Sequence, residues 1–331
     1  ACRRAPLPLS ARARRRVVPP PEVEHRDRSG AARLGASSVQ WGAYGRLAIL
    51  GCSRESDVVK GFVDYHMHAP LCGHAVGQPE EYVRRALDIG LREIGFSDHL
   101  YLYHLPAERR DPELAMREEE LPRYVEWIRA VQERAPHLPI RLGIEADYIP
   151  GHEARLAEIL GQCDFDYVYG SVHFIGEWGF DDPRYVERYA EWDVDALYER
   201  YFELVIAAAS TGLFDVMAHL DLVKKFGYRP RRDLAPLYRD LAAALKAADV
   251  VVEVSTAGLR KPVGEIYPSR DLLAACCKAG VPVTLGSDAH RPEEVGYAFD
   301  RAVDLLREVG YRTYVAFHRR RREARPLPSS P

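Results

Sequence analysis

Two histidines separated by one residue, His66 and His68, lie in a short stretch of mainly apolar residues, and His74 follows in the next loop. Side chains at i and i+2 of a β-strand point to the same side, so a strand here would project both imidazoles together. Neutral imidazole nitrogen is a good donor to zinc, iron and similar ions. The spacing therefore favours a metal site, with Cys72 either a soft ligand or a small loop residue beside it.

Metal-binding side chains recur at the ends of later strand-like segments. For any one histidine, an ordinary core or surface position is the plainer interpretation, but a shared position at strand ends favours metal binding for the whole set. The candidate ligands are seven of the twelve histidines and two acids: His66, His68, His74, His99, His173, His219, His290, Glu145 and Asp288. The other histidines are expected to have no such role, although His104 could line the mouth of a site: His25, His104, His137, His152 and His318.

The elements that must position these residues alternate between strand and helix patterns. Strands are predicted at 62–67, 92–97, 140–146, 166–173, 214–219, 249–255 and 282–287. Helices are predicted at 80–89, 121–133, 154–160, 194–209, 234–248, 269–279 and 293–308. Seven such units favour a closed or nearly closed parallel barrel, which places its chemistry at the carboxyl ends of the strands. No Gly-x-Gly-x-x-Gly turn follows any strand, which weakens a dinucleotide-binding alternative.

The two ends of the chain differ from this central region, which we expect to span residues 59–317. Residues 1–58 begin with an arginine-rich, acid-free stretch, which is either an organelle transit peptide or a non-native extension without a fold of its own. Residues 318–331 are expected to be a disordered, solvated basic tail.

Composition narrows the choice of partners and compartment. The 331 residues carry a formal net charge of -3, so no global basic field favours nucleic-acid binding. No run of about 18 apolar residues predicts a membrane span. The six cysteines include no Cys-x-x-Cys pair, which is typical of a reduced, cytoplasmic protein.

Taken together, the motifs resemble the polymerase and histidinol phosphatase (PHP) family over roughly residues 61–316. The stretches 254–261 (VSTAGLRK) and 265–269 (EIYPS) resemble its histidinol-phosphatase branch. The resemblance implies an α/β fold, a distorted (β/α)7 TIM-like barrel, holding three divalent ions of zinc, iron or manganese. It implies these ligands: His66, His68, Glu145 and Asp288 for the first ion; Glu145, His173 and His219 for the second; His74, His99 and His290 for the third.

The resemblance also implies a phosphomonoesterase that converts the small-molecule ester L-histidinol phosphate to L-histidinol and phosphate, in histidine biosynthesis. Clustered cations attract the ester, spread the charge on its oxygens and lower the pKa of bound water towards roughly 7. Arg260 is expected to clamp the phosphate, with Lys261 as a weaker candidate. Asp98 either orients a ligand histidine or protonates the leaving group. The expected substrate contacts are Arg260, Lys261, Ser255 and His104.

Three alternatives remain open. A PHP phosphoesterase could act on nucleotides or nucleic-acid ends, although the barrel segments lack a basic stripe. An amidohydrolase-type barrel also starts with His-x-His, but it would leave His74, His99 and His290 unexplained. The third alternative is a barrel that binds metal without turnover.

Overall fold

The computed structural model describes residues 60–327. The predicted extension at residues 1–58 and the last four residues of the predicted tail therefore lie outside the described residues. Within them, no helix is long and apolar enough to cross a bilayer. The cytoplasmic location stays a prediction.

Seven parallel strands form the centre of the molecule, and each lies inside a predicted strand segment or within one residue of it. They are β1 (Val63–Asp64), β2 (Glu93–Phe96), β3 (Ile140–Asp147), β4 (Tyr167–Ser171), β7 (Val216–Met217), β8 (Val251–Ser255) and β9 (Val283–Gly286). Neighbours in the sheet follow the sequence order β1-β2-β3-β4-β7-β8-β9. A short antiparallel hairpin, β5 (Phe174–Ile175) with β6 (Trp178–Gly179), follows β4.

The sheet closes on itself. The backbone N–H of Ala289, just after β9, donates to the carbonyl of His66 at 3.0 Å, and His68 N–H donates to the carbonyl of Ala289 at 2.9 Å. These bonds join the first and last strands of the sheet. The predicted distorted (β/α)7 barrel is thereby confirmed.

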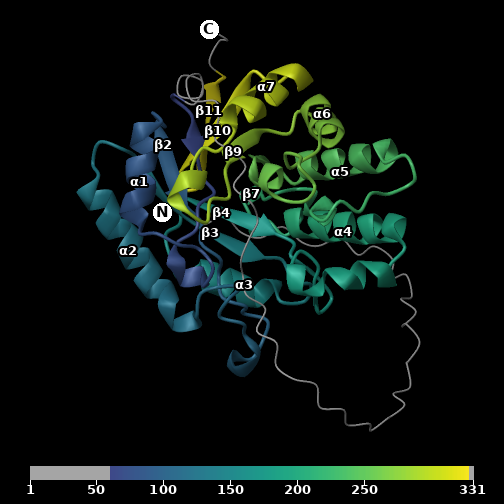
Figure 1. Cartoon of the computed structure of the whole chain (residues 1–331), viewed down its shortest axis with the longest axis horizontal. Helices are drawn as coiled ribbons and strands as arrows, with labels where there is room; N and C mark the ends of the chain where they lie inside the picture. The colour runs from purple at the N-terminus through teal and green to yellow at the C-terminus, as the bar shows by residue number, and fades with distance from the viewer. Residues whose placement is uncertain (1–59, 328–331) are drawn as a thin grey trace, which may run out of the picture. The chain divides into compact units, whose positions relative to one another are not determined.

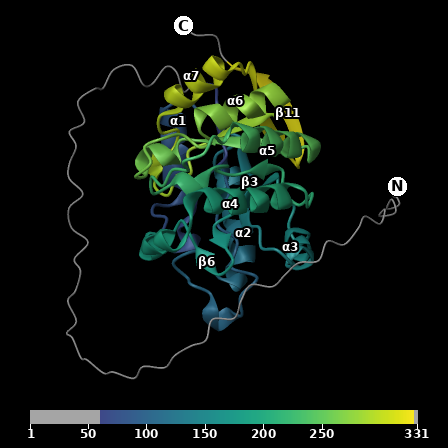
Figure 2. The ribbon, with the colours of Figure 1, turned by 90° about the vertical axis from the view of Figure 1, so that its right-hand side faces the viewer.

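Within residues 60–327, seven α-helices surround the strands (Figure 1). They are α1 (Pro79–Asp88), α2 (Leu121–Arg134), α3 (Glu153–Leu160), α4 (Val194–Ala209), α5 (Ala235–Ala247), α6 (Arg270–Ala279) and α7 (Phe299–Val309). Figure 2 shows α4, α5, α6 and α7 stacked in sequence order on one side of the barrel. The helix predicted at 293–308 begins later, at Phe299, because Gly296 and Ala298 adopt positive φ angles of 65° and 52° that interrupt a helix.

Aromatic side chains fill the barrel interior below the carboxyl ends. The hydroxyl of Tyr167 donates to the carbonyl of Tyr65 at 2.6 Å. A Cβ on either Gly95 or Gly143 would lie 2.3 Å from a side-chain atom of Tyr167. These two glycines, one on β2 and one on β3, therefore leave the space that this large ring occupies.

A C-terminal hairpin covers the amino ends of the strands and corrects the predicted disordered tail. Strands β10 (Thr313–His318) and β11 (Arg321–Pro326) pair antiparallel. Their arginines pair with acids at the starts of other strands: Arg325 Nη2 lies 3.0 Å from Glu93 Oε2, and Arg320 Nε lies 2.8 Å from Asp215 Oδ2. The basic run at 318–327 is ordered because these acids neutralise part of its charge, and the boundary predicted at residue 317 was wrong.

Candidate metal centre

The carboxylate of Glu145 lies at the centre of the imidazole cluster. Glu145 lies near the carboxyl end of β3 and is 1% exposed. One oxygen, Oε2, lies 3.2 Å from His66 Nε2 and 3.0 Å from His99 Nδ1. The other oxygen, Oε1, lies 3.0 Å from His219 Nε2 and 3.7 Å from His173 Nε2. Oε2 also lies 3.6 Å from His68 Nε2, so it faces three imidazoles while Oε1 faces two. This arrangement suits a carboxylate that bridges two ions.

The acid after β9, Asp288, faces the first two histidines. Its Oδ1 lies 3.1 Å from His68 Nε2 and 3.7 Å from His66 Nε2. Ligand atoms of these three residues all lie within 4.8 Å of one another. Together with Glu145 Oε2, they are the four residues predicted to hold the first ion.

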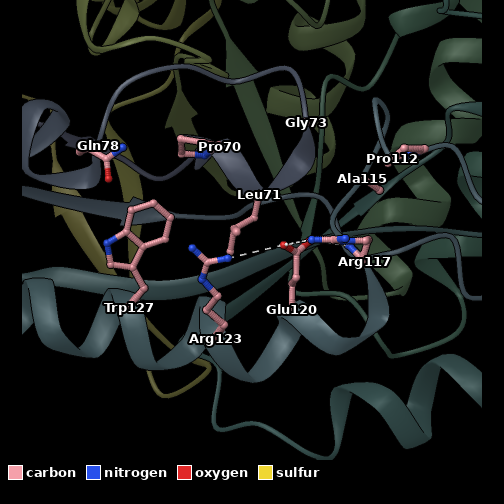
Figure 3. Close-up of a pocket in the computed structure, with 10 residues that line it drawn as sticks. All are labelled: Pro70, Leu71, Gly73, Gln78, Pro112, Ala115, Arg117, Glu120, Arg123 and Trp127. Carbon is pink, nitrogen blue, oxygen red and sulfur yellow. Dashed lines mark hydrogen bonds and ion pairs between the residues drawn. The ribbon is translucent and has the colours of Figure 1, made fainter.

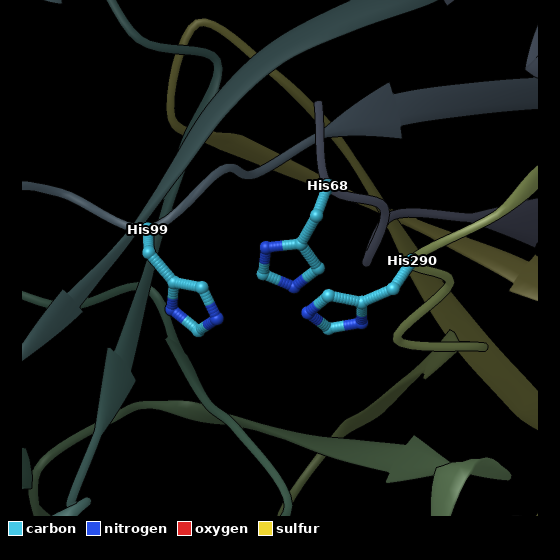
Figure 4. A group of neighbouring side chains, drawn as sticks. All are labelled: His68, His99 and His290. Atoms are coloured by element: carbon cyan, nitrogen blue, oxygen red, sulfur yellow. The ribbon is translucent and has the colours of Figure 1, made fainter. Parts of the chain in front are cut away.

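A second group of imidazoles lies beside them. Figure 4 shows the rings of His68, His99 and His290 converging on one space, and their ligand atoms also lie within 4.8 Å of one another. The ring of His74 stacks on that of His290, with centroids 4.7 Å apart, and lies 5.3 Å from that of His99. The structure thus brings the three residues predicted for the third ion together, with His68 as an additional neighbour.

Two acids that the sequence analysis did not select contact these candidate ligands. Glu253 Oε1 lies 2.6 Å from His66 Nδ1, and Asp147 Oδ1 lies 2.9 Å from His173 Nδ1. Such partners fix the ring orientation and tautomer of a ligand histidine. Both had a signal in the sequence: Glu253 is an acid within a run of buried valines, and Asp147 follows Glu145 by two residues and so points to the same side.

Space for the Glu253–His66 pair depends on Gly286, in β9. A Cβ at Gly286 would lie 2.0 Å from Glu253 Oε1 and 2.7 Å from the Cβ of His66. The next strand therefore has no side chain at the point where the acid approaches the imidazole.

Comparison with known proteins agrees with this geometry. The family model described as "PHP domain" matches residues 64–257. A protein from Deinococcus radiodurans named "Probable histidinol-phosphatase" is 48% identical over 268 residues, which cover 78% of this chain and 98% of the relative. The chain belongs to the PHP family.

Other relatives agree with this assignment. The histidinol-phosphatase of Bacillus subtilis is 29% identical, and the match covers 72% of this chain and 96% of that protein. Among solved structures, the histidinol phosphate phosphatase of Lactococcus lactis, "complexed with ZN, L-histidinol and phosphate", superposes with a TM-score of 0.69 and 22% sequence identity. That match covers 79% of this chain and 98% of the Lactococcus chain, and it supports the PHP-type fold.

The charges within the PHP centre suit divalent cations. Burial raises the pKa of the Glu145 carboxyl, but the imidazoles of His99, His66 and His219 lower it by more, to well below its usual value. Burial also raises the pKa of the Asp288 carboxyl, but the imidazoles of His66, His68 and His290 lower it by more, to well below its usual value. Burial and the imidazoles of His99 and His68 lower the pKa of His74 to about 4, so His74 is neutral at pH 7. Ionised carboxylates and neutral imidazoles are the protonation states in which these groups bind zinc, iron or manganese.

The predicted catalytic residue Asp98 lies directly behind a ligand. It is fully buried, and its Oδ1 is 3.5 Å from His68 Nδ1. The same oxygen accepts a hydrogen bond from the backbone N–H of His99 at 3.0 Å. From its buried position, Asp98 therefore contacts both the side chain of His68 and the backbone of His99.

Arg260 lies at the edge of the centre. Its Nη2 donates to the carbonyls of Ser287 at 2.8 Å and Asp288 at 3.0 Å. Its Nη1 is buried and has no hydrogen-bond partner within residues 60–327. Arg260 thus holds the segment that carries Asp288 while one N–H group remains available.

The other predicted substrate contacts have different surroundings. Lys261 is half-buried, and burial together with Lys225 lowers its pKa. Ser255 is fully buried and its hydroxyl accepts a hydrogen bond from Ala257 N–H at 3.3 Å, so it stabilises a turn. The ring of His104 lies 5.5 Å from the ring of Phe174, the residue that follows the candidate ligand His173.

Cys72 and Lys225 are further neighbours of the centre. Cys72 Sγ lies within 4.8 Å of ligand atoms of His74 and His290, but it donates to the carbonyl of Ala69 at 3.3 Å. Burial raises the pKa of this thiol, which favours the protonated, non-ligating form. Lys225, which the sequence analysis did not select, lies 3.0 Å from Asp181 Oδ2.

A cavity of about 690 Å³ lies outside the ligand set (Figure 3). The segment from Pro70 to Gly73 forms one wall, and Arg117, Arg123 and Trp127 lie on the other side. Both arginines pair with Glu120, at 3.1 Å and 3.7 Å. None of the predicted metal ligands lines this cavity.

Proposed function

We propose that this chain is a metal-dependent phosphomonoesterase that hydrolyses L-histidinol phosphate to L-histidinol and phosphate. The observation that carries the proposal is the Glu145 carboxylate, whose two oxygens face two separate groups of imidazoles: Oε2 faces His66, His68 and His99, and Oε1 faces His173 and His219. The names of the relatives support the substrate, because the match to the Deinococcus protein covers 98% of its length.

The proposed centre holds three divalent ions. His66, His68, Glu145 and Asp288 would hold the first ion, and Glu145, His173 and His219 the second. His74, His99 and His290 would hold the third. When bound, such ions supply positive charge to the phosphoryl oxygens and lower the pKa of water to roughly 7.

The residues of the chain position the reaction. Glu253 and Asp147 hold the rings of His66 and His173 so that Nε2 of each points into the centre. Asp98 lies 3.5 Å from His68 Nδ1, a looser contact than the other two, and its complete burial favours a positioning role over proton donation to the leaving alcohol. Water attacks phosphorus and the P–O bond to the alcohol breaks; of the two protons of that water, one is transferred to the leaving alcohol and the other stays with the phosphate.

The substrate is expected to lie between the proposed metal ligands and the rim of the barrel at its carboxyl end. Arg260 Nη1 is the unpaired donor that would bind a phosphate oxygen, and Lys261 adds positive charge beside it. His104 and Phe174 form an aromatic wall against which the imidazole of the substrate could pack. Ser255 would shape the turn before Arg260 rather than contact the substrate.

A substrate comparison tests the proposal. We expect kcat/KM for L-histidinol phosphate to exceed the values for nucleoside monophosphates and for an aryl phosphate by more than about tenfold, or about 1.4 kcal/mol. A smaller preference would contradict the histidinol-phosphate assignment, and a preference for nucleotides would favour the nucleotide-directed PHP alternative. Metal analysis of the same preparation should find about three equivalents per chain. One equivalent or none would contradict the trinuclear centre.

The role of Arg260 is tested by substitution. We expect Arg260→Ala to keep its metal and to lose at least about tenfold in kcat/KM, because the phosphate loses a charged donor. Arg291→Ala is a matched control: Arg291 also contacts Glu294, but its side chain is 58% exposed. Loss of metal from Arg260→Ala would show that Arg260 acts by holding the Asp288 segment instead.

A further inference from the structure

A second cavity, separate from the metal centre, has the features of a small-molecule site. It encloses about 500 Å³ between α4, α5, α6 and the segment that follows His219, on the side where Figure 2 shows these helices stacked. Its volume falls in the range of roughly 300–1,000 Å³ that is usual for ligand sites. None of the metal ligands or proposed substrate contacts lines it.

The floor of this cavity contains a buried carboxylate with an unused acceptor. Asp221 is 1% exposed. Its Oδ2 accepts a hydrogen bond from Ser269 N–H at 2.8 Å and lies 2.9 Å from Lys224 Nζ. Its Oδ1 has no hydrogen-bond partner within residues 60–327. A buried acceptor without a donor is destabilising, so a ligand that places a donor here would be stabilised.

Cations and carboxylates both line the rim. Arg239 and Lys278 are exposed and have no ion-pair partner in the part of the chain that the structure describes. Arg229 lies 2.7 Å from Glu265, and Asp271 lies 3.5 Å from Arg270. The carboxylate of Asp233 accepts a hydrogen bond from Ala235 N–H at 2.9 Å. The groups left for a ligand are thus an acceptor at the floor and two unpaired cations at the rim, with the Asp233 carboxylate, Tyr198 and Tyr238 also lining the cavity.

We propose that this cavity binds a free α-amino acid, with its ammonium group at Asp221 Oδ1 and its carboxylate at Arg239 and Lys278. The arrangement favours a zwitterion over a simple anion, because an anion could not supply the donor that Asp221 lacks. It also favours a zwitterion over a simple cation, which would leave the rim unpaired. The proposal does not depend on the substrate proposed for the metal centre.

The position of Asp221 connects the cavity to the metal centre. Asp221 follows the proposed ligand His219 by two residues, and Leu222 N–H donates to the carbonyl of His219 at 2.8 Å. His219 has a φ of 24°, which residues other than glycine rarely adopt, so the turn depends on its surroundings. A ligand that fixes Asp221 should stabilise this turn and slow the release of metal to a chelator.

Binding can be measured on the intact, metal-loaded protein. We expect at least one of the standard L-α-amino acids, at millimolar concentration, to raise the unfolding temperature and to give a binding isotherm in calorimetry. The N-acetyl derivative and the α-amide of the same amino acid should bind at least about tenfold more weakly, because each lacks one of the two charges. The amino acid should also slow metal loss to a chelator, a measurement that does not involve turnover.

Two variants locate the site. Asp221→Asn should abolish binding, but it also weakens the contact with the buried Lys224 and could impair folding. The double variant Arg239→Ala/Lys278→Ala changes only exposed side chains and should weaken binding at least about tenfold, while Arg129→Ala, an exposed arginine of α2, should leave binding unchanged. If no amino acid binds, or if binding persists unchanged in the double variant, the proposal is wrong. Phosphatase assays on the same proteins report separately on the function of the metal centre.

Discussion

The two ends of the barrel surround a buried carboxylate with different kinds of cation. At the amino end, Glu93 is 2% exposed, and its oxygens lie 2.6 Å from Arg141 Nε and 3.0 Å from Arg325 Nη2. At the carboxyl end, Glu145 is surrounded by imidazoles and by the hydroxyl of Ser171. A guanidinium is always protonated and satisfies the carboxylate permanently, whereas a neutral imidazole offers a lone pair. The same acid type therefore stabilises the fold at one end and is available to metal at the other.

The strongest test of this contrast is Glu145→Gln. Without the negative charge, the two oxygens can no longer offset the repulsion between neighbouring ions. We expect loss of bound metal and a fall in kcat/KM of more than about 100-fold, beyond the range for residues that only orient ligands. Elemental analysis and steady-state assays would measure both, and circular dichroism should show that the fold is retained. A fully loaded, active variant would rule out a bridging role.

Glu253→Gln should have a smaller effect at the same end. The amide can still approach His66 Nδ1 in the space beside Gly286, but it no longer stabilises the ring as a ligand. We expect metal affinity or kcat/KM to fall by about 10- to 100-fold, measured by metal titration and by turnover of the substrate. An unchanged affinity would indicate that His66 is held by the backbone alone.

Glu93→Gln is the matched substitution at the amino end. It leaves the partly buried Arg141 with a neutral partner, while Arg325 keeps only its contact with Glu323 at 2.9 Å. We therefore expect the free energy of unfolding to fall by about 3 kcal/mol. Metal content and kcat/KM at moderate temperature should match those of the wild type. Urea unfolding followed by fluorescence would measure the change. Loss of metal in this variant would contradict the proposal that Glu93 stabilises the fold and has no part in metal binding.

Metal binding at the carboxyl end should release protons from some of the histidines there. In the metal-free chain, burial lowers the pKa of His66, His68 and His173, but neighbouring carboxylates outweigh it. They raise the pKa of His66 well above its usual value, that of His68 to about 8 and that of His173 to about 10. The three rings therefore carry protons at pH 7 and must lose them to bind metal. We expect calorimetry in buffers of different ionisation enthalpy to show release of about two to three protons per chain. Metal affinity should rise with pH until these pKa values are passed, and a pH-independent affinity would contradict this assignment.

The barrel and the grouping of the candidate ligands at one end of it were predictable because both depend on local patterns. A parallel strand places its last residues at one edge of the sheet, so His66, Glu145 and Asp288 were expected to meet although they are far apart in the sequence. The sequence marks Glu253 as an acid within a run of valines, but it does not show that His66 is its partner, because that depends on the space left by Gly286 on the neighbouring strand.

The C-terminal hairpin was missed for a related reason. An arginine-rich run is usually solvated, and the acids that order this one, Glu93 and Asp215, lie more than 100 residues earlier in the chain. Nothing near Arg320 or Arg325 in the sequence indicates those partners. Long-range charge pairing becomes visible only once the barrel brings the starts of its strands together.

Closure of the barrel between β1 and β9 has a consequence for biosynthesis. The first proposed ion takes His66 and His68 from the first strand and Asp288 from the segment after the last, and Asp288 is 220 residues beyond His68. A nascent chain still on the ribosome cannot complete this ligand set until nearly the whole barrel has emerged. Incorporation of the ions would then occur after synthesis of the barrel, and a prematurely terminated chain would lack the first ion.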